Sequence, residues 1–145
     1  MVSKVTPTVI VCGALFGGAF LARTALDWFV PTADFSVRSQ ISTYVGISLL
    51  LATGFWSAWR SGSTTSGTFS AASAALIGAI VSVAGAAAML TVFHDQQTLA
   101  AIEGSGGLAE VFTLPIVMVV PALILGTIGG ALGAAANSKL RIDPV

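Results

Sequence analysis

The chain has 145 residues, of which 55% are hydrophobic and only 8% are charged. Soluble domains carry about 25% charged residues because polar side chains must cover their surface. This composition therefore argues against a water-soluble fold, and the length predicts a single membrane domain over residues 1–145. The net charge is zero, which offers no basic face to nucleic acid, and the single cysteine excludes an intrachain disulfide.

The charged residues divide the chain into four long uncharged stretches, which cover 5–22, 39–59, 61–94 and 111–138. A helix needs about 20 predominantly apolar residues to cross the hydrocarbon core of a bilayer, and each stretch is long enough. The sequence therefore predicts an all-α, integral membrane four-helix bundle. We expect its transmembrane helices at about 7–29, 40–60, 68–93 and 110–136.

The first predicted span ends in a pair of opposite charges. Arg23 lies four residues before Asp27, so the two side chains can pair on one helix face. At the membrane interface a long arginine stem reaches the headgroups, which makes such a pair an inexpensive anchor. Deeper in the membrane the same pair would mark a polar pathway, and we favour the anchor.

The second predicted span, 40–60, is bounded by short polar links at 30–36 and 61–67. Links this short make consecutive helices antiparallel neighbours, which predicts an up-down-up-down bundle. Tryptophans lie at both expected interfaces, Trp28 at one and Trp56 with Trp59 at the other. Their positions fit the aromatic belts of membrane proteins.

The third predicted span has a side of small residues opposite a side that carries larger ones such as Leu76 and Ile80. The segment after it, 94–107, is polar enough to lie at the surface. Asp95 can cap a short helix that ends at Gly104. We expect that helix to face the membrane through Leu99 and Ile102.

The fourth predicted span begins near Glu110 and contains Pro115 and Pro121. A carboxylate in the first turn of a helix complements the helix dipole. The favoured interpretation of Glu110 is therefore a residue at the end of the span. The alternative is a proton- or cation-binding carboxylate in a bundle cavity. Prolines in membrane helices commonly bend the span without breaking it, so we expect one kinked helix.

Glycine is concentrated on particular faces of these spans. In lipid its missing side chain lets another helix approach closely and increases van der Waals contact. Such faces serve either packing within the chain or a homodimer interface, and we favour packing within the chain. The stripe on the fourth span ends at Asn137, whose amide can hydrogen-bond across to a neighbouring helix. The helix-packing glycines that we predict are Gly13, Gly17, Gly18, Gly78, Gly85, Gly126, Gly130 and Gly133.

The basic residues predict how the bundle is oriented. Four crossings place Lys4, Arg60, Lys139 and Arg141 on one side and leave only two arginines on the other. Lysine and arginine are enriched on the cytoplasmic side of membrane proteins. We therefore expect both termini to be cytoplasmic.

The sequence offers little for catalysis or for a cofactor. His94 is the single histidine, so a haem or metal site lacks the set of ligands that it requires. The glycine-rich segment 104–107 follows no predicted strand and is not followed by the lysine of a phosphate-binding loop. We expect no enzyme, no cofactor and no metal, and a membrane enzyme or electron carrier that uses His94 is the least favoured alternative.

These observations favour a small polytopic protein of the cell membrane, of the size and composition found in bacterial inner membranes, with a structural, interaction or accessory role. Its expected partners are the lipid bilayer and either further copies of itself or a larger membrane complex. The alternative is a small transporter or channel whose path is lined by the kinked fourth helix. In that case Arg23, Asp27 and Glu110 are the candidate polar residues.

Overall fold

A computed structural model describes residues 7–30, 32 and 34–141, with the side chains of 140 and 141 left out. The described residues form helices and no strands. The helices are α1 (Pro7–Phe29), α2 (Ser36–Ser61), α3 (Thr64–Val92), α4 (Gln96–Gly104), α5 (Gly107–Val117) and α6 (Val119–Arg141).

Four helical segments are long and apolar enough to cross a membrane, which agrees with the number of candidate spans predicted from the charges. They are α1, α2, α3 and the combined segment Gly107–Lys139. The first agrees with the predicted range. The helices α2 and α3 begin four residues earlier than predicted, because their first turns are built from polar residues that hydropathy assigns to the links.

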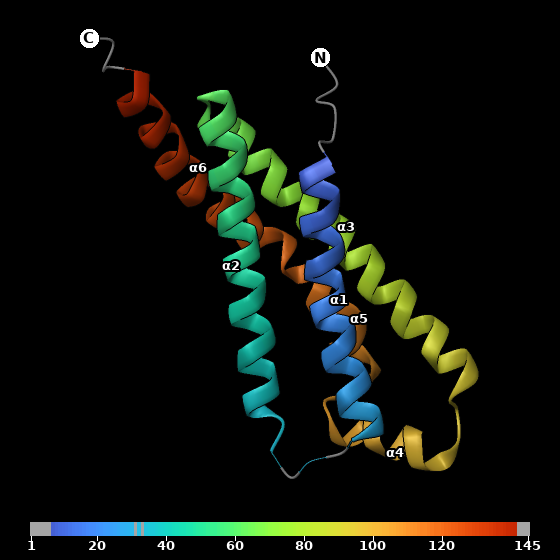
Figure 1. Cartoon of the computed structure of the whole chain (residues 1–145). Helices are drawn as coiled ribbons and strands as arrows, with labels where there is room; N and C mark the ends of the chain where they lie inside the picture. Colours follow the sequence, from blue (N-terminus) through green and yellow to red (C-terminus); the bar gives the residue numbers. More distant parts are fainter. Residues whose placement is uncertain (1–6, 31, 33, 142–145) are drawn as a thin grey trace.

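The four long segments alternate in direction through the bundle (Figure 1). As a result α1 begins and α6 ends at one end of the molecule, where the α2–α3 turn also lies. We call this the Arg60 end, after the last charged residue of α2. The short helix α4 lies across the opposite end and leads into α5 (Figure 1).

The closest helix pairs are not consecutive in the sequence. The helix α2 packs most extensively against α6, and α1 against α3. Glycines allow both approaches: a Cβ added at Gly54 of α2 would lie 2.9 Å from the Cα of Gly126 in α6, and one added at Gly13 of α1 would lie 2.8 Å from the carbonyl oxygen of Ala74 in α3. Real Cβ atoms do not approach other atoms so closely, so only glycine permits this spacing.

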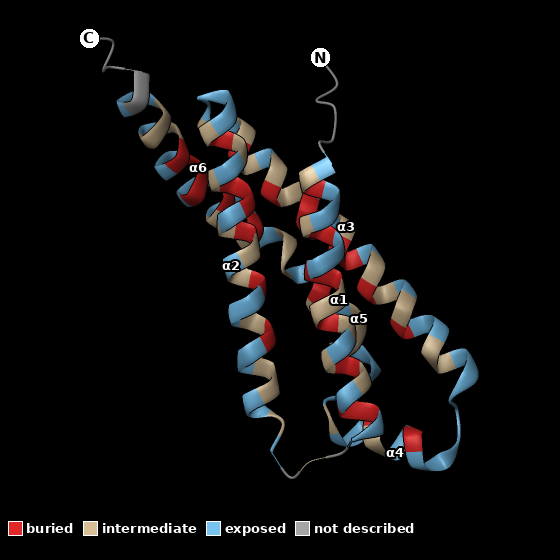
Figure 2. Ribbon diagram, viewed as in Figure 1, coloured by how far each residue is buried: buried red, intermediate tan, exposed pale blue. Residues whose placement is uncertain are grey.

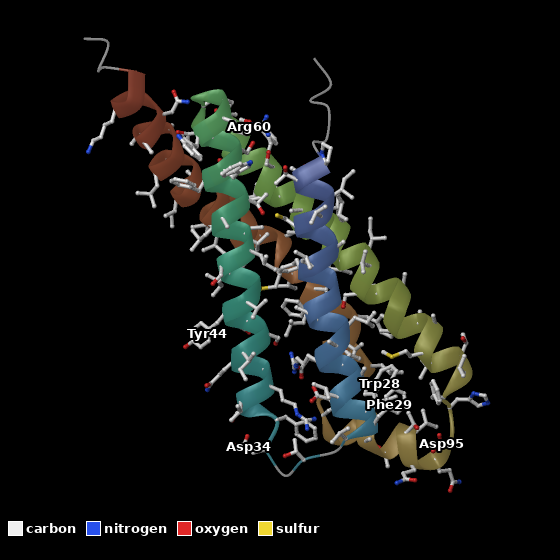
Figure 3. The ribbon with its side chains drawn as sticks, in the orientation of Figure 1. Trp28, Phe29, Asp34, Tyr44, Arg60 and Asp95 are labelled. Atoms are coloured by element: carbon white, nitrogen blue, oxygen red, sulfur yellow. The ribbon has the colours of Figure 1, made fainter. Side chains whose placement is uncertain are left out.

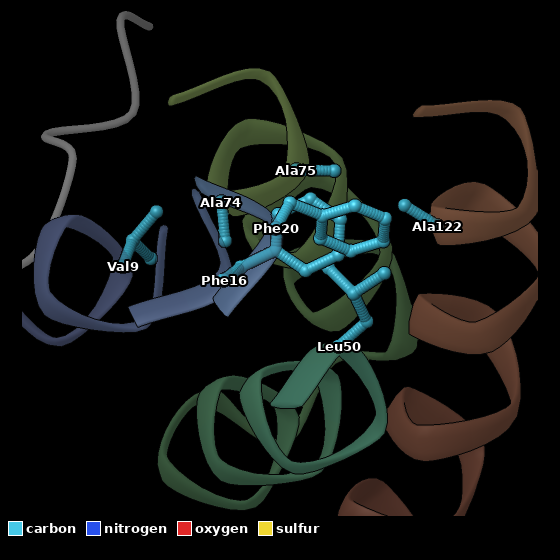
Figure 4. Packing of buried hydrophobic residues seen from close by; sticks show 7 residues of the cluster. All are labelled: Val9, Phe16, Phe20, Leu50, Ala74, Ala75 and Ala122. Carbon is cyan, nitrogen blue, oxygen red and sulfur yellow. The ribbon is translucent and has the colours of Figure 1, made fainter. Parts of the chain in front are cut away.

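The main core lies where α1, α2, α3 and α6 meet (Figure 4). The rings of Phe16 and Phe20 of α1 contact each other in a tilted arrangement, with centroids 4.9 Å apart, and Leu50 of α2 is fully buried in the same cluster. The other helices contribute mainly alanines, among them Ala75 and Ala122. Large aromatic rings from one helix thus fill the space that small residues leave on the others.

Large apolar side chains cover the outside of the bundle, and exposed and buried positions alternate along each long helix (Figure 2). On α3 the predicted separation of faces is confirmed for Leu76 and Ile80, which are exposed, and for the small residues Ala74, Ala75 and Gly78, which are buried. It is wrong at Ile77 on the larger side, which is partly buried and packs against the core. A surface this apolar is suited to lipid or to another apolar protein surface.

The expected single fourth helix is two helices, α5 and α6, separated by Met118. Proline has no backbone N–H and its ring clashes with the carbonyl four residues earlier, so Pro115 and Pro121 both weaken the regular helix here. The turns nevertheless continue, because the N–H of Met118 donates to Leu114 and that of Ala122 to Met118, each at 3.1 Å. The segment is therefore a kinked span.

The prediction of a short helix after α3 is confirmed, whereas the orientation predicted for it is wrong at one residue. Asp95 caps α4 by accepting hydrogen bonds from the backbone N–H groups of Gln97 and Thr98. Leu99 is exposed as expected, but Ile102 is buried against Trp28. The helix packs back onto the bundle, so this isoleucine contacts protein.

The same contact corrects the interpretation of Trp28. This residue does not belong to an exposed aromatic belt: its side chain is 3% exposed and packs with Ala86 and Ile102. Figure 3 shows it at the end of the bundle where Asp34 and Asp95 lie. At the Arg60 end Trp56 is exposed, as a belt residue is expected to be.

Candidate functional site

Charged side chains from three helices meet near the α4 end of the bundle. Arg23 of α1 donates a 2.7 Å hydrogen bond from Nη2 to Oε1 of Glu110 in α5. Its Nε also lies 3.3 Å from Oδ2 of Asp27, one turn further along α1. The Arg23 side chain is 12% exposed and that of Glu110 is 36% exposed, so this arginine is largely buried and links two helices.

A second arginine approaches the same carboxylate from α2. Arg38 lies with Nη1 3.3 Å from Oδ1 of Asp27. The same nitrogen donates to the carbonyl oxygens of Leu26 at 2.9 Å and Val30 at 2.8 Å. Arg38 therefore caps the C-terminal turn of α1, where a cation is favoured by the free carbonyls and the helix dipole.

The ion-pair cluster, by which we mean Arg23, Asp27, Arg38 and Glu110, is balanced in charge. Asp27 is 4% exposed, and a carboxylate buried to this degree is costly unless it is paired and hydrogen-bonded. Two guanidinium groups supply that compensation. Removing one partner of a buried pair costs about 3–5 kcal/mol because the other charge is left unpaired. The cluster thus fixes how α1, α2 and α5 are placed.

A small cavity of about 20 Å³, lined by both polar and apolar side chains, lies beside the cluster. Such a volume accommodates about one water molecule. Two buried nitrogens next to it, Nε1 of Trp28 and Nε of Arg23, donate no hydrogen bond within the described residues. For Arg23 the short distance to Asp27 makes an ion pair without the alignment of a hydrogen bond. The other residues that line the cavity are Phe20, Thr24, Asp27, Ser82, Ser105, Glu110, Val111, Leu114 and Pro115.

The cavity has the groups to bind a single small polar molecule. Its indole and guanidinium N–H groups are donors, its carboxylates are acceptors, and the hydroxyl of Ser82 can serve as either. It extends to Pro115 and is far smaller than the 300 Å³ at which ligand pockets begin. The arrangement can therefore hold a water or relay a proton over a short distance.

The structure brings together the three residues that the sequence singled out as a polar group. Arg23 pairs with both Asp27 and Glu110, although Glu110 is far away in the sequence. Arg38 and Trp28 were not recognised as members of this site. The position of Arg38 could have been predicted in part from the sequence. The short link between α1 and α2 places the first turn of α2, which contains Arg38, beside the last turn of α1.

The glycine faces are largely occupied by contacts within the chain. Gly17 packs against Gly78, Gly85 against the side chain of Leu21, and Gly130 against the backbone of Thr64. The remaining predicted positions behave alike, since a Cβ at any of them would meet an atom of another helix within 3.0 Å; these are Gly13, Gly126 and Gly133. At the end of the stripe Asn137 donates to the carbonyl of Trp59 in α2, as its amide was expected to do.

Gly18 is the exception among the predicted packing residues. A Cβ added there would meet no heavy atom within 4 Å. It follows Gly17 by one residue, a rotation of about 100° that turns it away from α3. Ala14 and Ala22, one turn before and one turn after Gly18, are exposed, so these three residues form a second small-residue stripe on α1 that remains accessible in the described part of the chain.

No group of three or more potential metal ligands (His, Cys, Asp or Glu) occurs among the described residues. His94 is exposed next to Asp95 and distant from the ion-pair cluster in the sequence. Hydrogen bonds from the backbone N–H and the hydroxyl of Thr98 lower the pKa of the Asp95 carboxyl below its ordinary value, as is expected for a helix N-cap. Comparisons with protein-family models, with curated proteins and with solved structures find no match to this chain.

Proposed function

We propose that this chain is a multi-pass protein of the cell membrane with a structural, interaction or accessory role, rather than an enzyme. The observation that carries the proposal is a division between two surfaces, the small-residue faces of the helices and their large apolar side chains. The small-residue faces pack against one another within the chain, while large apolar side chains cover the outside. The internal charged groups are balanced in charge, and the cavity beside them holds about one water molecule.

Association with other proteins then takes place through the outer surface. Because the glycine contacts that would support a dimer are used inside the bundle, a second copy or a different partner must contact lipid-facing side chains or the accessible stripe at Gly18. In most pre-organised complexes the backbone at the interface moves little on binding. A bacterial inner membrane is the location that we propose, on the basis of size and composition.

Site-specific photocrosslinking in native membranes tests this role. A photoreactive amino acid is placed at one exposed position on each spanning segment, namely Val11, Tyr44, Ile80 and Ile124. A protein partner, whether a second copy or another chain, should be captured at positions on one side of the bundle. Lipid adducts alone at all four positions would contradict an interaction role.

The second candidate is a small transporter or channel, favoured by one specific observation. Arg23, Asp27 and Glu110 line a cavity that extends to Pro115 at the kink of the fourth span, and Glu110 is the most exposed of the four charges. A path through this point would move protons or small ions past Glu110. Proteoliposomes with the wild-type chain should then show a flux that Glu110→Gln abolishes, whereas the structural role predicts no flux from either protein.

A further inference from the structure

A groove runs between α1 and α2 at the Arg60 end of the bundle, and it lies outside the ion-pair cluster. Two adjoining cavities of about 460 and 550 Å³ form it. They share the lining residues Thr8, Thr53 and Trp56, so they lie side by side along the same surface. Both volumes fall within the 300–1,000 Å³ typical of sites that bind a small molecule.

The part of the groove nearer the middle of the bundle is apolar. It is lined by Cys12 of α1, by Leu51 and Phe55 of α2, and by Leu132 of α6. Thr53 is buried and its hydroxyl donates to the carbonyl of Leu49, so it offers no free donor to the groove. This part can receive a hydrocarbon chain and holds few groups that would bind a polar ligand.

The part at the end of the bundle contains polar groups and a positive charge beside apolar ones. Arg60 lines it together with the hydroxyl-bearing residues Ser57, Ser61 and Ser66. Arg60 forms no ion pair with any of the other described residues. Figure 3 shows it at the last turn of α2. A guanidinium group with five N–H donors is well suited to a phosphate.

The serines near Arg60 form a connected group of hydroxyls. Oγ of Ser57 lies 3.0 Å from that of Ser66 and 2.7 Å from that of Ser70, and Ser61 donates to the carbonyl of Ser57 at 2.9 Å. Ser57, Ser61 and Ser66 line the same cavity as Arg60, and no carboxylate that would repel an anion is among the described residues that line it.

We propose that this groove binds one anionic phospholipid. Its phosphate is held by Arg60 and the adjacent serine hydroxyls, and one acyl chain lies along the apolar part toward Leu51 and Leu132. The direction agrees with that of a bilayer lipid, because the charged end lies at the end of the bundle and the apolar part at membrane depth. Basic pockets between membrane helices on the cytoplasmic side bind lipid headgroups by the same chemistry. The inference rests on the proposed membrane location.

Retention of lipid by the purified protein tests the proposal. The detergent-solubilised chain is exposed to vesicles of phosphatidylcholine with or without phosphatidylglycerol, and bound lipid is counted by native mass spectrometry. We expect one phosphatidylglycerol per chain. Arg60→Gln should weaken its binding about tenfold, the effect of losing one charge-assisted contact. Lys139→Gln is the matched control, since Lys139 is exposed at the same end and does not line the groove.

A second variant tests the apolar part of the groove without changing any charge. Ala52 is exposed and lines that part, so Ala52→Trp should fill it and lower lipid retention while the protein keeps its helical content. Three results would overturn the proposal: equal retention of the two lipids, equal loss in Arg60→Gln and Lys139→Gln, or displacement of the lipid by inorganic phosphate alone. A chain that stays folded without detergent would instead refute the membrane location itself.

Discussion

Gly17 of α1 and Gly78 of α3 lie with their backbones in direct contact. A Cβ added at Gly17 would lie 2.9 Å from the Cα of Gly78, and one added at Gly78 would lie 2.9 Å from the backbone nitrogen of Gly17. Both of these atoms belong to the backbone, so neither can move aside without a shift of a whole helix, and a Cβ at Gly78 would also meet the ring of Phe16. The contact fixes the distance between the two helices that carry most of the buried core.

We predict that Gly17→Ala destabilises the bundle by about 1–3 kcal/mol, the usual cost of forcing extra atoms into a packed interior. Alanine has the higher helix propensity, so a loss of stability cannot be attributed to the helix itself. The measurement is reversible unfolding in mixed micelles with increasing dodecyl sulfate, followed by circular dichroism.

Gly18→Ala is the matched control for this variant. It makes the same chemical change one residue away, where an added Cβ meets no atom within 4 Å. We expect it to leave stability unchanged or to raise it by up to about 1 kcal/mol through helix propensity. Equal effects at the two positions would contradict the close approach of α1 and α3.

A second prediction concerns the ion-pair cluster. Asp27→Asn should destabilise the protein by about 3 kcal/mol, because it leaves Arg23 and Arg38 without their shared buried partner. Glu110→Gln should cost less, about 1 kcal/mol, because the Glu110 side chain is 36% exposed and its ion pair is partly screened. The same unfolding titration measures both.

A double-mutant cycle separates the Arg23–Glu110 contact from the other effects of these changes. Arg23→Gln, Glu110→Gln and the double variant should give a coupling energy of about 0.5–3 kcal/mol, as is usual for residues in direct contact. Additive losses within experimental error would mean that the hydrogen bond contributes nothing to stability.

Much of this fold is readable from the distribution of charges and small residues. Charges at the ends of apolar stretches define the four spans, and on α3 the side that carries Ala74 and Gly78 is buried as the residue pattern indicates. The pattern cannot say which helices pair, because every span offers a small face. The preference of α1 for α3 and of α2 for α6 depends on the fit of whole surfaces.

The candidate site was predictable only in part. Arg23 and Asp27 are one turn apart, so local geometry indicates their pairing. The contact with Glu110 requires that the chain return to the same end of the bundle and that α4 pack against it. The burial of Trp28 depends on that packing, because Ile102 of α4 contacts it. No local sequence pattern indicates this burial.

A third prediction follows from the cap of α4. The folded pKa of Asp95 lies below its ordinary value of about 3.8, so its contribution to stability is fully present above that value and is lost as the pH falls through the lower, folded pKa. We expect the amides of Gln97 and Thr98 to lose protection from hydrogen exchange in acid before the amides of α3 do. Asp95→Asn should remove this pH dependence while keeping a cap, because asparagine also accepts from the first turn. An unchanged pH profile in that variant would show that another group titrates.

The last prediction concerns the side of the membrane on which each end of the bundle lies. Ser63 lies in the turn at the Arg60 end and Gln97 lies on α4 at the opposite end, and both are exposed. Because basic residues gather at the Arg60 end, the positive-inside bias places it in the cytoplasm. With Cys12 replaced by alanine, a membrane-impermeant maleimide added to intact cells should therefore label Gln97→Cys and leave Ser63→Cys unlabelled. Permeabilised cells should label both, which controls for accessibility.

Labelling of Ser63→Cys alone in intact cells would invert the orientation and place the groove that contains Arg60 in the outer leaflet. Labelling of both variants in intact cells would contradict a membrane crossing by α3, the long helix between these two positions.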